Sequence, residues 1–334
     1  MTSRHSAPRA RTTLTSWRVR NILRTLLTGG NGMLGSSIAQ AWGLARPDDE
    51  LIVVTRDVVD LTDKRATAAV IARVQPDLII HAAAKVGGIQ DKIAKPVSYL
   101  LDNLLIDTSV LAGAIDAGVE NLLYIGSAIV YPEHYRQPFL EGDVLAGPLE
   151  PANEGYAIAK IAATKLCEYA EKQYGFTYRV ASPSNLYGPN DDYSLGHGHL
   201  VAAAIAKIQA AQTAGSDTVE VWGDGTARRE FTYVADLADW LVDQSDKLAA
   251  WPPMLNLGFG ADHSIREYYE AAAAAIGYTG GFDYDVSKPA GMHQRILDSS
   301  AARSLGWNPT TSIADGMAES YRQFLAGSES RKAS

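Results

Sequence analysis

The chain has 334 residues, a formal net charge of −8 and 46% hydrophobic residues, which suits one large α/β domain or two lobes that share a cleft. Its only cysteine, Cys167, excludes an intramolecular disulfide and a cysteine-cluster metal site, and it fits a reducing compartment, so we expect a cytoplasmic protein without a metal. No apolar run approaches the roughly 18–20 residues of a membrane span, and the mild acidity argues against a nucleic-acid partner.

Residues 1–24 differ in composition from the rest of the chain. They hold six arginines and no acidic residue. Transit peptides have this composition, but an upstream start codon or a disordered tail produces it as well. Because the alanine-rich remainder is typical of a bacterial protein, we favour the disordered tail.

From residue 25 onward, short apolar runs alternate with stretches of helical periodicity. The apolar runs predict strands at 25–29, 50–55, 77–83, 121–127 and 177–184. Continuous apolar strands that alternate with helices indicate a parallel sheet covered on both faces, so we predict a doubly wound α/β (Rossmann) fold that binds its ligand at the carboxyl ends of the strands. We expect a dinucleotide-binding domain at 25–185. Residues 186–330 should form mainly a smaller C-terminal substrate-binding lobe, with some segments returning to the Rossmann core.

A glycine-rich loop follows the first predicted strand. In "TGGNGMLG" (28–35), Gly29, Gly32 and Gly35 have the spacing G-x-x-G-x-x-G and lead into a helix. Such a loop brings backbone close to a pyrophosphate, and the helix N-terminus offers free N–H groups and a positive dipole end. The context on both sides predicts a dinucleotide site.

The end of the second strand points to the type of cofactor. An acidic residue there binds the ribose hydroxyls of NAD, whereas an arginine accommodates the 2′-phosphate of NADP. Arg56 directly follows the strand and Asp57 comes one residue later. We therefore predict NADPH, against the alternative that Arg56 is an ordinary solvated charge.

A tyrosine and a lysine lie at positions i and i+4 of a predicted helix. Tyr156 and Lys160 share one helix face, and Ser127 ends the fourth predicted strand 29 residues before the tyrosine. A lysine cation lowers the pKa of a neighbouring phenol from its usual value of about 10. Tyr156 can then donate a proton to a carbonyl oxygen that Ser127 also binds, while a nicotinamide supplies hydride.

With these motifs in place, the chain resembles the extended short-chain dehydrogenase/reductase family, and within it the branch of GDP-L-fucose synthases. The resemblance runs from about residue 25 to 325 and includes "AAAKVGGI" (82–89), "LEPANEGYAIAKIAATKLCE" (149–168), "NLYGPND" (185–191), "VWGDGTARREF" (221–231) and "SKPAGM" (287–292). It implies that Ser127, Tyr156 and Lys160 reduce a C4 ketone and that His199 is an acid/base in C3/C5 epimerisation.

The resemblance also implies binding residues. Arg229 is the best candidate for a diphosphate contact, because a guanidinium matches phosphate oxygens. The implied cofactor-binding residues are Gly29, Asn31, Gly32, Met33, Leu34, Gly35, Arg56, Asp60, Leu61, Ala82, Ala84, Tyr156 and Lys160. The implied substrate-binding residues are Lys85, Ala128, Asn185, His199, Lys207, Trp222 and Arg229. From the residues alone, Lys207 and Trp222 could equally be a solvated charge and lobe packing.

The chain departs from the family pattern at two positions. Asn31 stands where the family commonly has an arginine that helps to bind the 2′-phosphate. Ile129 stands where the family has its epimerisation cysteine, and an isoleucine side chain cannot move a proton. Cys167 falls in the helix after Lys160, where we expect it to be part of the core.

We therefore expect NADPH-dependent reduction of the C4 ketone of a GDP-linked 4-keto sugar, a deoxyhexose or a heptose, with lost or altered epimerase activity. The alternatives are a full GDP-L-fucose synthase, a nucleotide-sugar epimerase with tightly bound NAD, and a binding protein that has lost catalysis. By analogy with the family, we expect a homodimer formed through a four-helix bundle.

Overall fold

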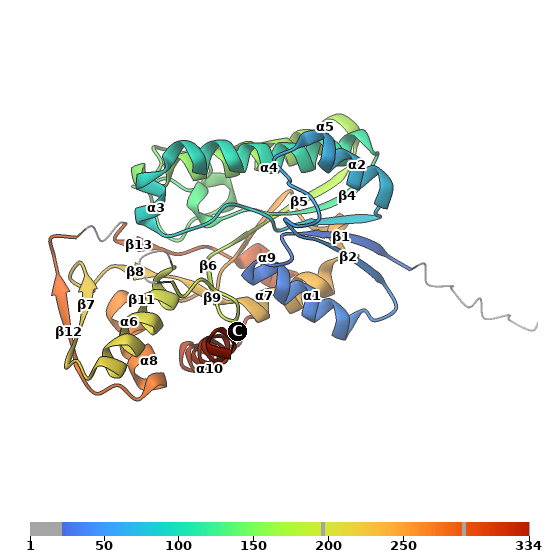
Figure 1. The fold of residues 1–334 in the computed structure, drawn as a ribbon. Coiled ribbons are helices and arrows are strands. Elements are labelled where there is room, and N and C mark those ends of the chain that lie inside the picture. The colour runs from blue at the N-terminus through green and yellow to red at the C-terminus, as the bar shows by residue number, and fades with distance from the viewer. Residues whose placement is uncertain (1–21, 195–197, 289–291, 334) are drawn as a thin grey trace, which may run out of the picture.

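The computed structural model describes residues 22–194, 198–288 and 292–333 (Figure 1). The transit-peptide or tail interpretation of the first 21 residues, and the middle of "SKPAGM", lie outside this range. The first part of the chain forms, in order, β1 (Arg24–Thr28), α1 (Met33–Ala45), β2 (Glu50–Val54), α2 (Lys64–Val74), β3 (Leu78–His81), α3 (Ile89–Ala94), α4 (Pro96–Asp116), β4 (Asn121–Ile125), α5 (Glu154–Tyr174) and β5 (Thr177–Pro183).

Local sequence signals explain several helix ends. The Asp63 side chain accepts hydrogen bonds from two backbone N–H groups in the first turn of α2, and such an N-cap stabilises a helix by about 1 kcal/mol. Helix α5 ends at Gly175, whose φ of 76° lies in the left-handed region that glycine adopts without strain. The helix that bears Tyr156 and Lys160 therefore has a clear end signal in the sequence.

The central sheet has six strands in the order β10-β5-β4-β3-β1-β2, where β10 is Met254–Leu257, and all of its strand pairs are parallel. The chain runs outward from β1 to β2 and then crosses to β3 on the other side of β1. Ligands bind at such a reversal, outside the carboxyl ends of the strands. The loops after β1 and β3, which carry the glycine motif and "AAAK", therefore meet at one edge.

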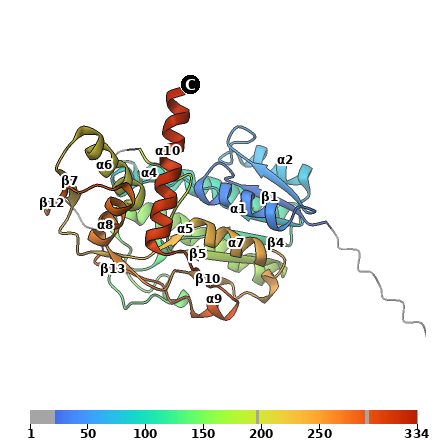
Figure 2. The same cartoon turned by 90° about the horizontal axis from the view of Figure 1, so that it is seen from below.

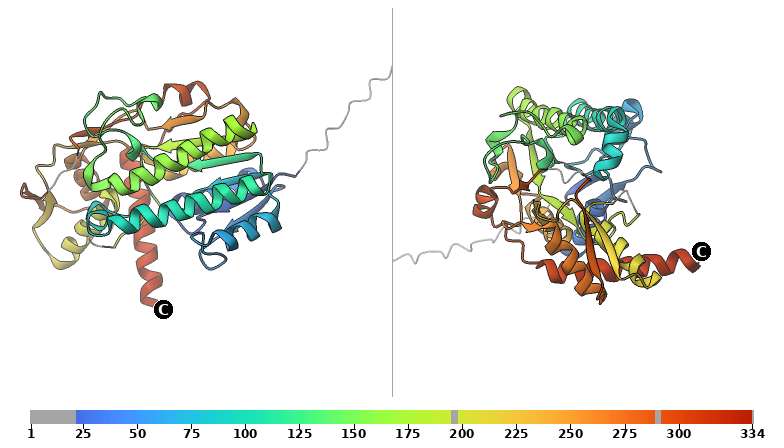
Figure 3. Two further views of the ribbon diagram at one scale, coloured as in Figure 1. Left: turned by 90° about the horizontal axis from the view of Figure 1, so that it is seen from above. Right: turned by 90° about the vertical axis from the view of Figure 1, so that its left-hand side faces the viewer.

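Helices cover both faces of this sheet, as the apolar strands predict. Helices α2, α4 and α5 pack on one face, and α1, α7 (Val234–Gln244) and α9 (Ser300–Ser304) pack on the other (Figure 1). Figure 3 shows α4 and α5 running side by side across the outside of the molecule. The predicted doubly wound α/β fold is confirmed.

The second part of the chain builds a smaller body beside the sheet (Figure 2). Its buried centre is formed by apolar side chains of α6, α8 and the short strands near them. Its elements are β6 (Asn185–Tyr187), α6 (Leu200–Ala214), β7 (Thr218–Trp222), β8 (Arg228–Arg229), β9 (Phe231–Tyr233), β11 (His263–Ser264), α8 (Ile265–Ile276), β12 (Gly281–Asp285), β13 (Gln294–Arg295) and α10 (Ile313–Ala333).

Three later elements return to the Rossmann sheet. Strand β10 extends it next to β5, and α7 and α9 pack beneath it with the tryptophan cluster Trp240, Trp251 and Trp307. Within the described ranges, every helix is too short or too polar to cross a bilayer.

Candidate active site

A cavity of about 1160 Å³ lies at the carboxyl ends of the sheet strands and is lined by both parts of the chain. It brings together the glycine loop, the end of β2, the Ser127–Tyr156–Lys160 group and side chains of the second body. The predicted residues that line it are Gly29, Asn31, Gly32, Met33, Leu34, Gly35, Arg56, Asp60, Leu61, Ala82, Ala84, Lys85, Ser127, Tyr156, Lys160, Asn185, His199, Lys207, Trp222 and Arg229. Ala128 is buried and is not among the lining residues.

The glycine loop brings bare backbone to the cavity because two of its positions have no room for a side chain. Gly29 has a φ of 77°, and a Cβ there would lie 2.6 Å from the backbone nitrogen of Ala83. A Cβ at Gly35 would lie 2.1 Å from the Gly29 carbonyl oxygen. Gly32 caps α1, whose first turn holds no acidic residue. The free N–H groups and the positive dipole end of α1 therefore face the cavity unopposed by a local carboxylate.

The end of β2 places one basic and two acidic residues at the cavity edge. Arg56 and Asp57 both line the cavity, and Arg56 is exposed. Asp60 accepts hydrogen bonds from the Thr62 backbone N–H at 2.9 Å and from its hydroxyl at 2.8 Å, and these bonds lower the pKa of Asp60. Asp60 is thus engaged within its own loop, while Arg56 stands at the position predicted for a phosphate contact.

Ser127, Tyr156 and Lys160 meet at the end of β4. Ser127 follows that strand and caps the short 3-10 helix η1 (Ala128–Val130), accepting a hydrogen bond from the Ile129 N–H at 3.3 Å. Lys160 Nζ donates to the Ile125 carbonyl at 3.2 Å, and Ser127 hydrogen-bonds the phenol of Tyr156. The three side chains therefore lie together at the end of β4, and all three line the cavity.

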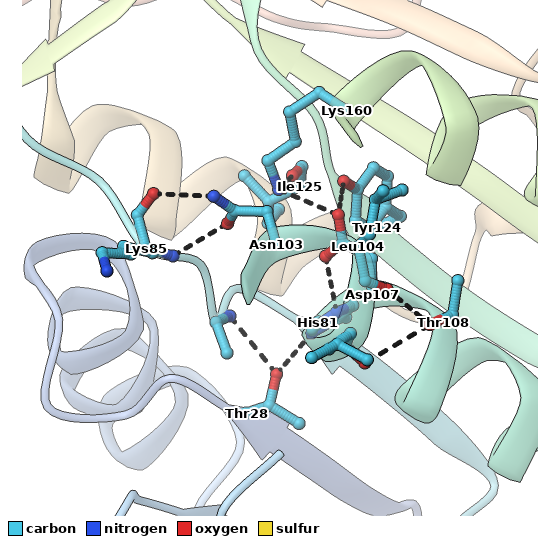
Figure 4. A network of polar contacts seen from close by, with 12 residues as sticks. Thr28, His81, Lys85, Asn103, Leu104, Asp107, Thr108, Tyr124, Ile125 and Lys160 are labelled. Atoms are coloured by element: carbon cyan, nitrogen blue, oxygen red, sulfur yellow. Dashed lines mark hydrogen bonds and ion pairs between the residues drawn. The ribbon is translucent and has the colours of Figure 1, made fainter. Parts of the chain in front are cut away.

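A chain of buried polar groups lies beneath Lys160, and we call Thr28, His81, Asp107, Tyr124 and Lys160 the floor (Figure 4). The Asp107 carboxylate lies 3.9 Å from Lys160 Nζ, accepts from the Tyr124 hydroxyl at 2.7 Å and lies 3.1 Å from His81 Nε2. His81 Nδ1 lies 2.7 Å from the Thr28 hydroxyl. The floor thus connects strand β1, strand β3 and helix α4 to Lys160.

In the floor, the positive charge of Lys160 is balanced by the negative charge of Asp107. Burial lowers the pKa of His81 and favours its neutral ring. Burial would raise the pKa of Asp107, but Lys160, His81 and Tyr124 outweigh it and hold that pKa below its usual value. Sequence reasoning missed Asp107, because one aspartate in the apolar run "LLIDTSVL" is a weak signal until the fold brings it under Lys160.

The expected lowering of the Tyr156 pKa is wrong for this structure. Burial raises that pKa, the Asp107 carboxylate raises it further, and the hydrogen bond with Ser127 opposes both only in part. Lys160 was expected to lower the pKa of Tyr156. The Asp107 carboxylate lies 3.9 Å from Lys160 Nζ, and its negative charge opposes the effect of the ammonium group on the phenol. The Tyr156 phenol is therefore held protonated.

Ile129 and Cys167 are two positions at which a base for removing a proton from a sugar carbon was considered. Ile129 is buried and lines the cavity next to Ser127. Cys167 is fully buried in the core, and burial raises the pKa of its thiol. Neither side chain can take a proton from a sugar carbon, and Cys167 is part of the core as expected.

The second body contributes polar side chains to the far end of the cavity. His199 caps α6 with its Nδ1 3.5 Å from an Asp191 carboxylate oxygen, and the Asn185 amide donates to the Glu230 carbonyl at 3.2 Å. Lys207 Nζ lies 5.4 Å from the centroid of the Trp222 ring and donates to the Glu220 carbonyl at 3.1 Å. Lys207 and Trp222 therefore form one platform that faces the cavity.

Four charged side chains, which we call the wall, line the cavity between α3 and β8: Lys92, Glu150, Arg229 and Arg295. Arg295 donates to Glu150 at 2.7 Å, and both side chains are buried. Burial and Arg295 lower the pKa of Arg229 to about 10, against the opposing Glu150. Three cations and one carboxylate leave the wall with a positive balance, which favours an anionic ligand.

Lys85, a predicted substrate ligand, is held by side chains of α4. Its ammonium pairs with Asp102 at 2.7 Å and with Ser98, and its backbone is held by the Asn103 amide (Figure 4). The described residues contain no group of three His, Cys, Asp or Glu side chains that could hold a metal.

Comparison with known proteins agrees with this geometry. Residues 25–258 match the model of the NAD-dependent epimerase/dehydratase family. The chain is 38% identical over 306 residues to a GDP-L-fucose synthase of Azorhizobium caulinodans, covering 92% of this chain and 97% of that protein. It is also 38% identical over 304 residues to a GDP-L-colitose synthase of Yersinia pseudotuberculosis, covering 91% and 98%.

A solved structure shares the fold. A GDP-mannoheptose C4 reductase from Campylobacter jejuni with NADP bound superposes with a TM-score of 0.81 at 24% identity, covering 91% of this chain and 98% of that one. At this identity the likeness shows the architecture alone.

Proposed function

The chain belongs to the NAD-dependent epimerase/dehydratase family, and from this premise we propose that it is an NADPH-dependent reductase of the C4 ketone of a GDP-linked 4-keto sugar. The observation that carries the proposal is the meeting of Ser127, Tyr156 and Lys160 in the same cavity as a glycine loop that has no room for a Cβ at Gly29 or Gly35. We further propose residues 25–185 as the dinucleotide-binding domain and 186–330 as mainly the substrate-binding lobe.

The residues present fit a nicotinamide dinucleotide. Gly29 and Gly35 leave backbone accessible for a pyrophosphate, and Arg56 offers a guanidinium where a 2′-phosphate would lie. When bound, NADPH supplies the hydride. The structural neighbour with NADP bound has the same architecture, which supports this choice of cofactor.

The protein's part in the reduction is to bind the ketone and deliver a proton. Ser127 donates a hydrogen bond to the ketone oxygen and holds it beside Tyr156. The Tyr156 O–H bond breaks as its proton passes to the oxygen that gains charge, a step that contributes roughly 10²–10⁴-fold in rate. Lys160, supported from below by Asp107, stabilises the phenolate that forms.

The wall fits the diphosphate of a nucleotide sugar. Arg229 and Arg295 lie on neighbouring strands, β8 and β13, paired at residue 229 with residue 295. Guanidinium groups bind phosphate oxygens in pairs of hydrogen bonds. The Lys207–Trp222 platform suits a base or ribose at the outer end. We propose Arg229 as the main diphosphate contact and His199, Asn185 and Lys85 as sugar-side contacts.

The proposed function has two forms, which differ in whether the protein also epimerises C3 and C5, the carbons on either side of the ketone. Ile129 and the buried Cys167 favour a reductase whose C3/C5 epimerisation is lost or altered. The 38% identity to GDP-L-fucose synthases favours the bifunctional enzyme. An epimerase that retains NAD is the further alternative, and stoichiometric NAD in the purified protein would establish it.

The deciding experiment is NMR in D₂O with GDP-4-keto-6-deoxy-D-mannose, first without and then with NADPH. NADPH oxidation without deuterium at C3 or C5 is the result we expect from a stand-alone reductase. Deuterium at both carbons, followed by GDP-L-fucose once NADPH is added, would show the bifunctional enzyme instead. If neither step gives a reaction, a GDP-linked 4-keto heptose is the next substrate, and failure with both sugars would reject the proposal.

We also propose a homodimer through the outer faces of α4 and α5 (Figure 3). Large apolar side chains there are exposed, among them Val97, Leu101 and Ile158 at 73%, 50% and 42%. Two copies of this helix pair would bury them in a four-helix bundle. Light scattering at micromolar concentration should give twice the chain mass, and Leu101→Glu with Ile158→Glu should give a monomer. A monomeric wild type would reject the dimer.

A further inference from the structure

Glu230 is a buried carboxylate behind the wall. It directly follows Arg229 in the chain, is 1% exposed and is not among the residues that line the main cavity. Its Oε1 accepts a hydrogen bond from the Gly260 backbone N–H at 2.7 Å, and its Oε2 accepts one from the Leu297 backbone N–H at 2.9 Å. Both oxygens of Glu230 are therefore engaged by the backbone of two distant segments.

The main chain of Glu230 contacts further residues of the cavity. Its N–H donates to the Arg295 carbonyl at 3.3 Å, and strands β8 and β13 pair Arg229 with Arg295. Its carbonyl accepts from the side-chain amide of Asn185 at 3.2 Å, and Asn185 also lines the cavity. Three residues of the candidate binding surface are therefore adjacent to Glu230 or bonded to its main chain.

The two segments that the carboxylate joins reach the Rossmann core. Gly260 lies in the loop that follows β10, an edge strand of the six-stranded sheet. The Leu297 side chain is buried in the same hydrophobic cluster as Tyr156 and Ile129. The carboxylate of Glu230 thus ties the wall to the sheet and to the cluster that contains the proposed proton donor.

The loop after β10 leaves room for this carboxylate. A Cβ at Gly258 would lie 2.4 Å from Oε1 of Glu230 and 2.6 Å from its Oε2, so only a glycine fits beside it. The Gly258 N–H donates to the Ser299 hydroxyl at 2.8 Å, and the Gly258 carbonyl accepts from the Trp307 indole N–H at 2.7 Å. Because both backbone groups of Gly258 are bonded, the loop is a fixed support for the carboxylate.

The strength of this link depends on the charge of Glu230. Burial raises the pKa of Glu230 to about 7 against its two N–H bonds, while nearby Asp262 raises that pKa and Arg303 of α9 lowers it. Tyr268 of α8 has a raised pKa and donates to the Arg229 carbonyl at 3.0 Å. An ionised carboxylate accepts backbone N–H bonds more strongly than a neutral acid does.

We propose that Glu230 is a positioning residue that holds Arg229 and Arg295 where they bind the diphosphate of the substrate while its ketone lies at Tyr156, an inference that rests on the proposed function. A guanidinium binds two phosphate oxygens at once only in a fixed orientation, so the backbone that carries it has to be held. Glu230 holds that backbone from behind the wall and acts on the substrate through the two arginines.

The first test is Glu230→Gln, which keeps the size of the side chain. The amide nitrogen of glutamine donates and cannot accept, so one of the two backbone N–H groups loses its partner. We expect KM for the GDP-sugar, and Kd for GDP in titration calorimetry, to rise by about 10-fold because the guanidinium groups are displaced from their binding orientation. NADPH binding should not change, and kcat should change by less than about 2-fold.

The matched control is Asp236→Asn, in a carboxylate that joins two segments away from the cavity. Asp236 accepts from the backbone N–H groups of Thr310 and Thr311, both at 2.9 Å, and does not line the cavity. Its loss should lower the free energy of unfolding and leave KM and the Kd for GDP unchanged. Equal rises of KM in Glu230→Gln and Asp236→Asn would show a general loss of stability and would overturn the inference.

Two further readouts test whether Glu230 acts through the arginines and as an anion. In an Arg229→Ala background, Glu230→Gln should raise KM by much less than it does in the wild type, because residues that act together are not additive. The ratio of KM in Glu230→Gln to KM in the wild type should be largest near pH 8 and should shrink toward pH 6, where the wild-type carboxylate takes up a proton. Full additivity, or a ratio that does not change with pH, would overturn the inference.

Fluorescence of bound NADPH reports whether each variant folds. If Glu230→Gln does not bind NADPH, Gly258→Ala takes its place, because the added Cβ displaces the carboxylate without removing it. A variant that binds NADPH and has the wild-type KM and Kd for GDP would overturn the role of Glu230 and leave the reductase intact. A wild type that binds no GDP and oxidises no NADPH with deoxyhexose or heptose substrates would reject the proposed function itself.

Discussion

The floor and the wall of the cavity use charge in different ways. In the floor, every side chain is buried and the one cation lies against the one anion, Lys160 and Asp107. In the wall, three cations surround a single carboxylate, Glu150. The floor can therefore be completed by folding alone, whereas the wall reaches electrical balance only with an anionic ligand. Under the proposed function, folding alone sets the acid–base geometry, whereas the charge of the wall is neutralised when the substrate binds.

Tyr156 lies where floor and wall meet, so its removal should have the largest effect. Tyr156→Phe takes away the proton donor and should reduce the rate of NADPH oxidation by about 10³-fold, within the range for a general acid. NADPH binding, measured by fluorescence, should persist because the glycine loop is untouched. Undiminished turnover in this variant would exclude Tyr156 as the proton donor, whereas a wild type that binds NADPH but does not oxidise it would favour a binding protein that kept the fold.

The floor is tested by Asp107→Asn. This change leaves the Lys160 cation buried without its counter-charge, which should cost about 3–5 kcal/mol in the free energy of unfolding. Denaturant titration measures that loss. The matched control is Asp102→Asn, which breaks the partly exposed pair with Lys85 and should cost about 0–1 kcal/mol. Equal losses in the two variants would show that the floor is no more tightly coupled than a surface pair.

Stability in acid should also depend on the floor. The pKa of Asp107 is lowered in the folded protein, so its contribution to stability is present above the unfolded pKa of about 4 and is lost as pH falls through the lower folded value. Asp107→Asn should therefore flatten the stability profile below pH about 4. If the stability of Asp107→Asn depends on pH as that of the wild type does, Asp107 is not the group that causes the loss of stability in acid.

The wall is tested by Arg229→Ala. Loss of a charge-assisted contact of about 1.5–3 kcal/mol should raise KM for the GDP-sugar by roughly 10- to 100-fold, with a smaller change in kcat. Lys207→Ala, at the outer platform, should raise KM less. Steady-state kinetics at fixed NADPH measures both. If kcat falls and KM does not change in Arg229→Ala, the wall acts in chemistry and the comparison with the floor fails.

Substitution of Arg56, at the edge of the cavity after β2, should have the smallest effect of these changes. Arg56→Ala removes the proposed 2′-phosphate contact, but Asp57 remains beside it. We expect the NADPH/NADH preference in kcat/KM to fall by about 5-fold, because an exposed charge contact is worth about 1 kcal/mol. Arg56→Lys should keep part of the preference. A preference that does not change in Arg56→Ala would remove Arg56 from the cofactor site.

Local sequence patterns were sufficient to identify Lys160 of the floor, but they did not identify the residues that contact it. Tyr156 and Lys160 share a helix face at any position in a protein, because the i, i+4 spacing is a property of the helix. Asp107 carries no such mark, and neither do Lys92 and Arg295, which come from a short helix and a two-residue strand. Their roles depend on contacts between residues far apart in the chain, such as Arg295 with Glu150.

The sequence by itself determined the alternation of strands and helices, the glycine loop and the reductase group, because each depends on short-range spacing and backbone geometry. Only the tertiary structure decided the protonation of Tyr156, the balance of charge in the floor and the meeting of the four charged side chains in the wall. The pKa of a buried group depends on its burial and on charges brought close from distant parts of the chain, and no local pattern records either.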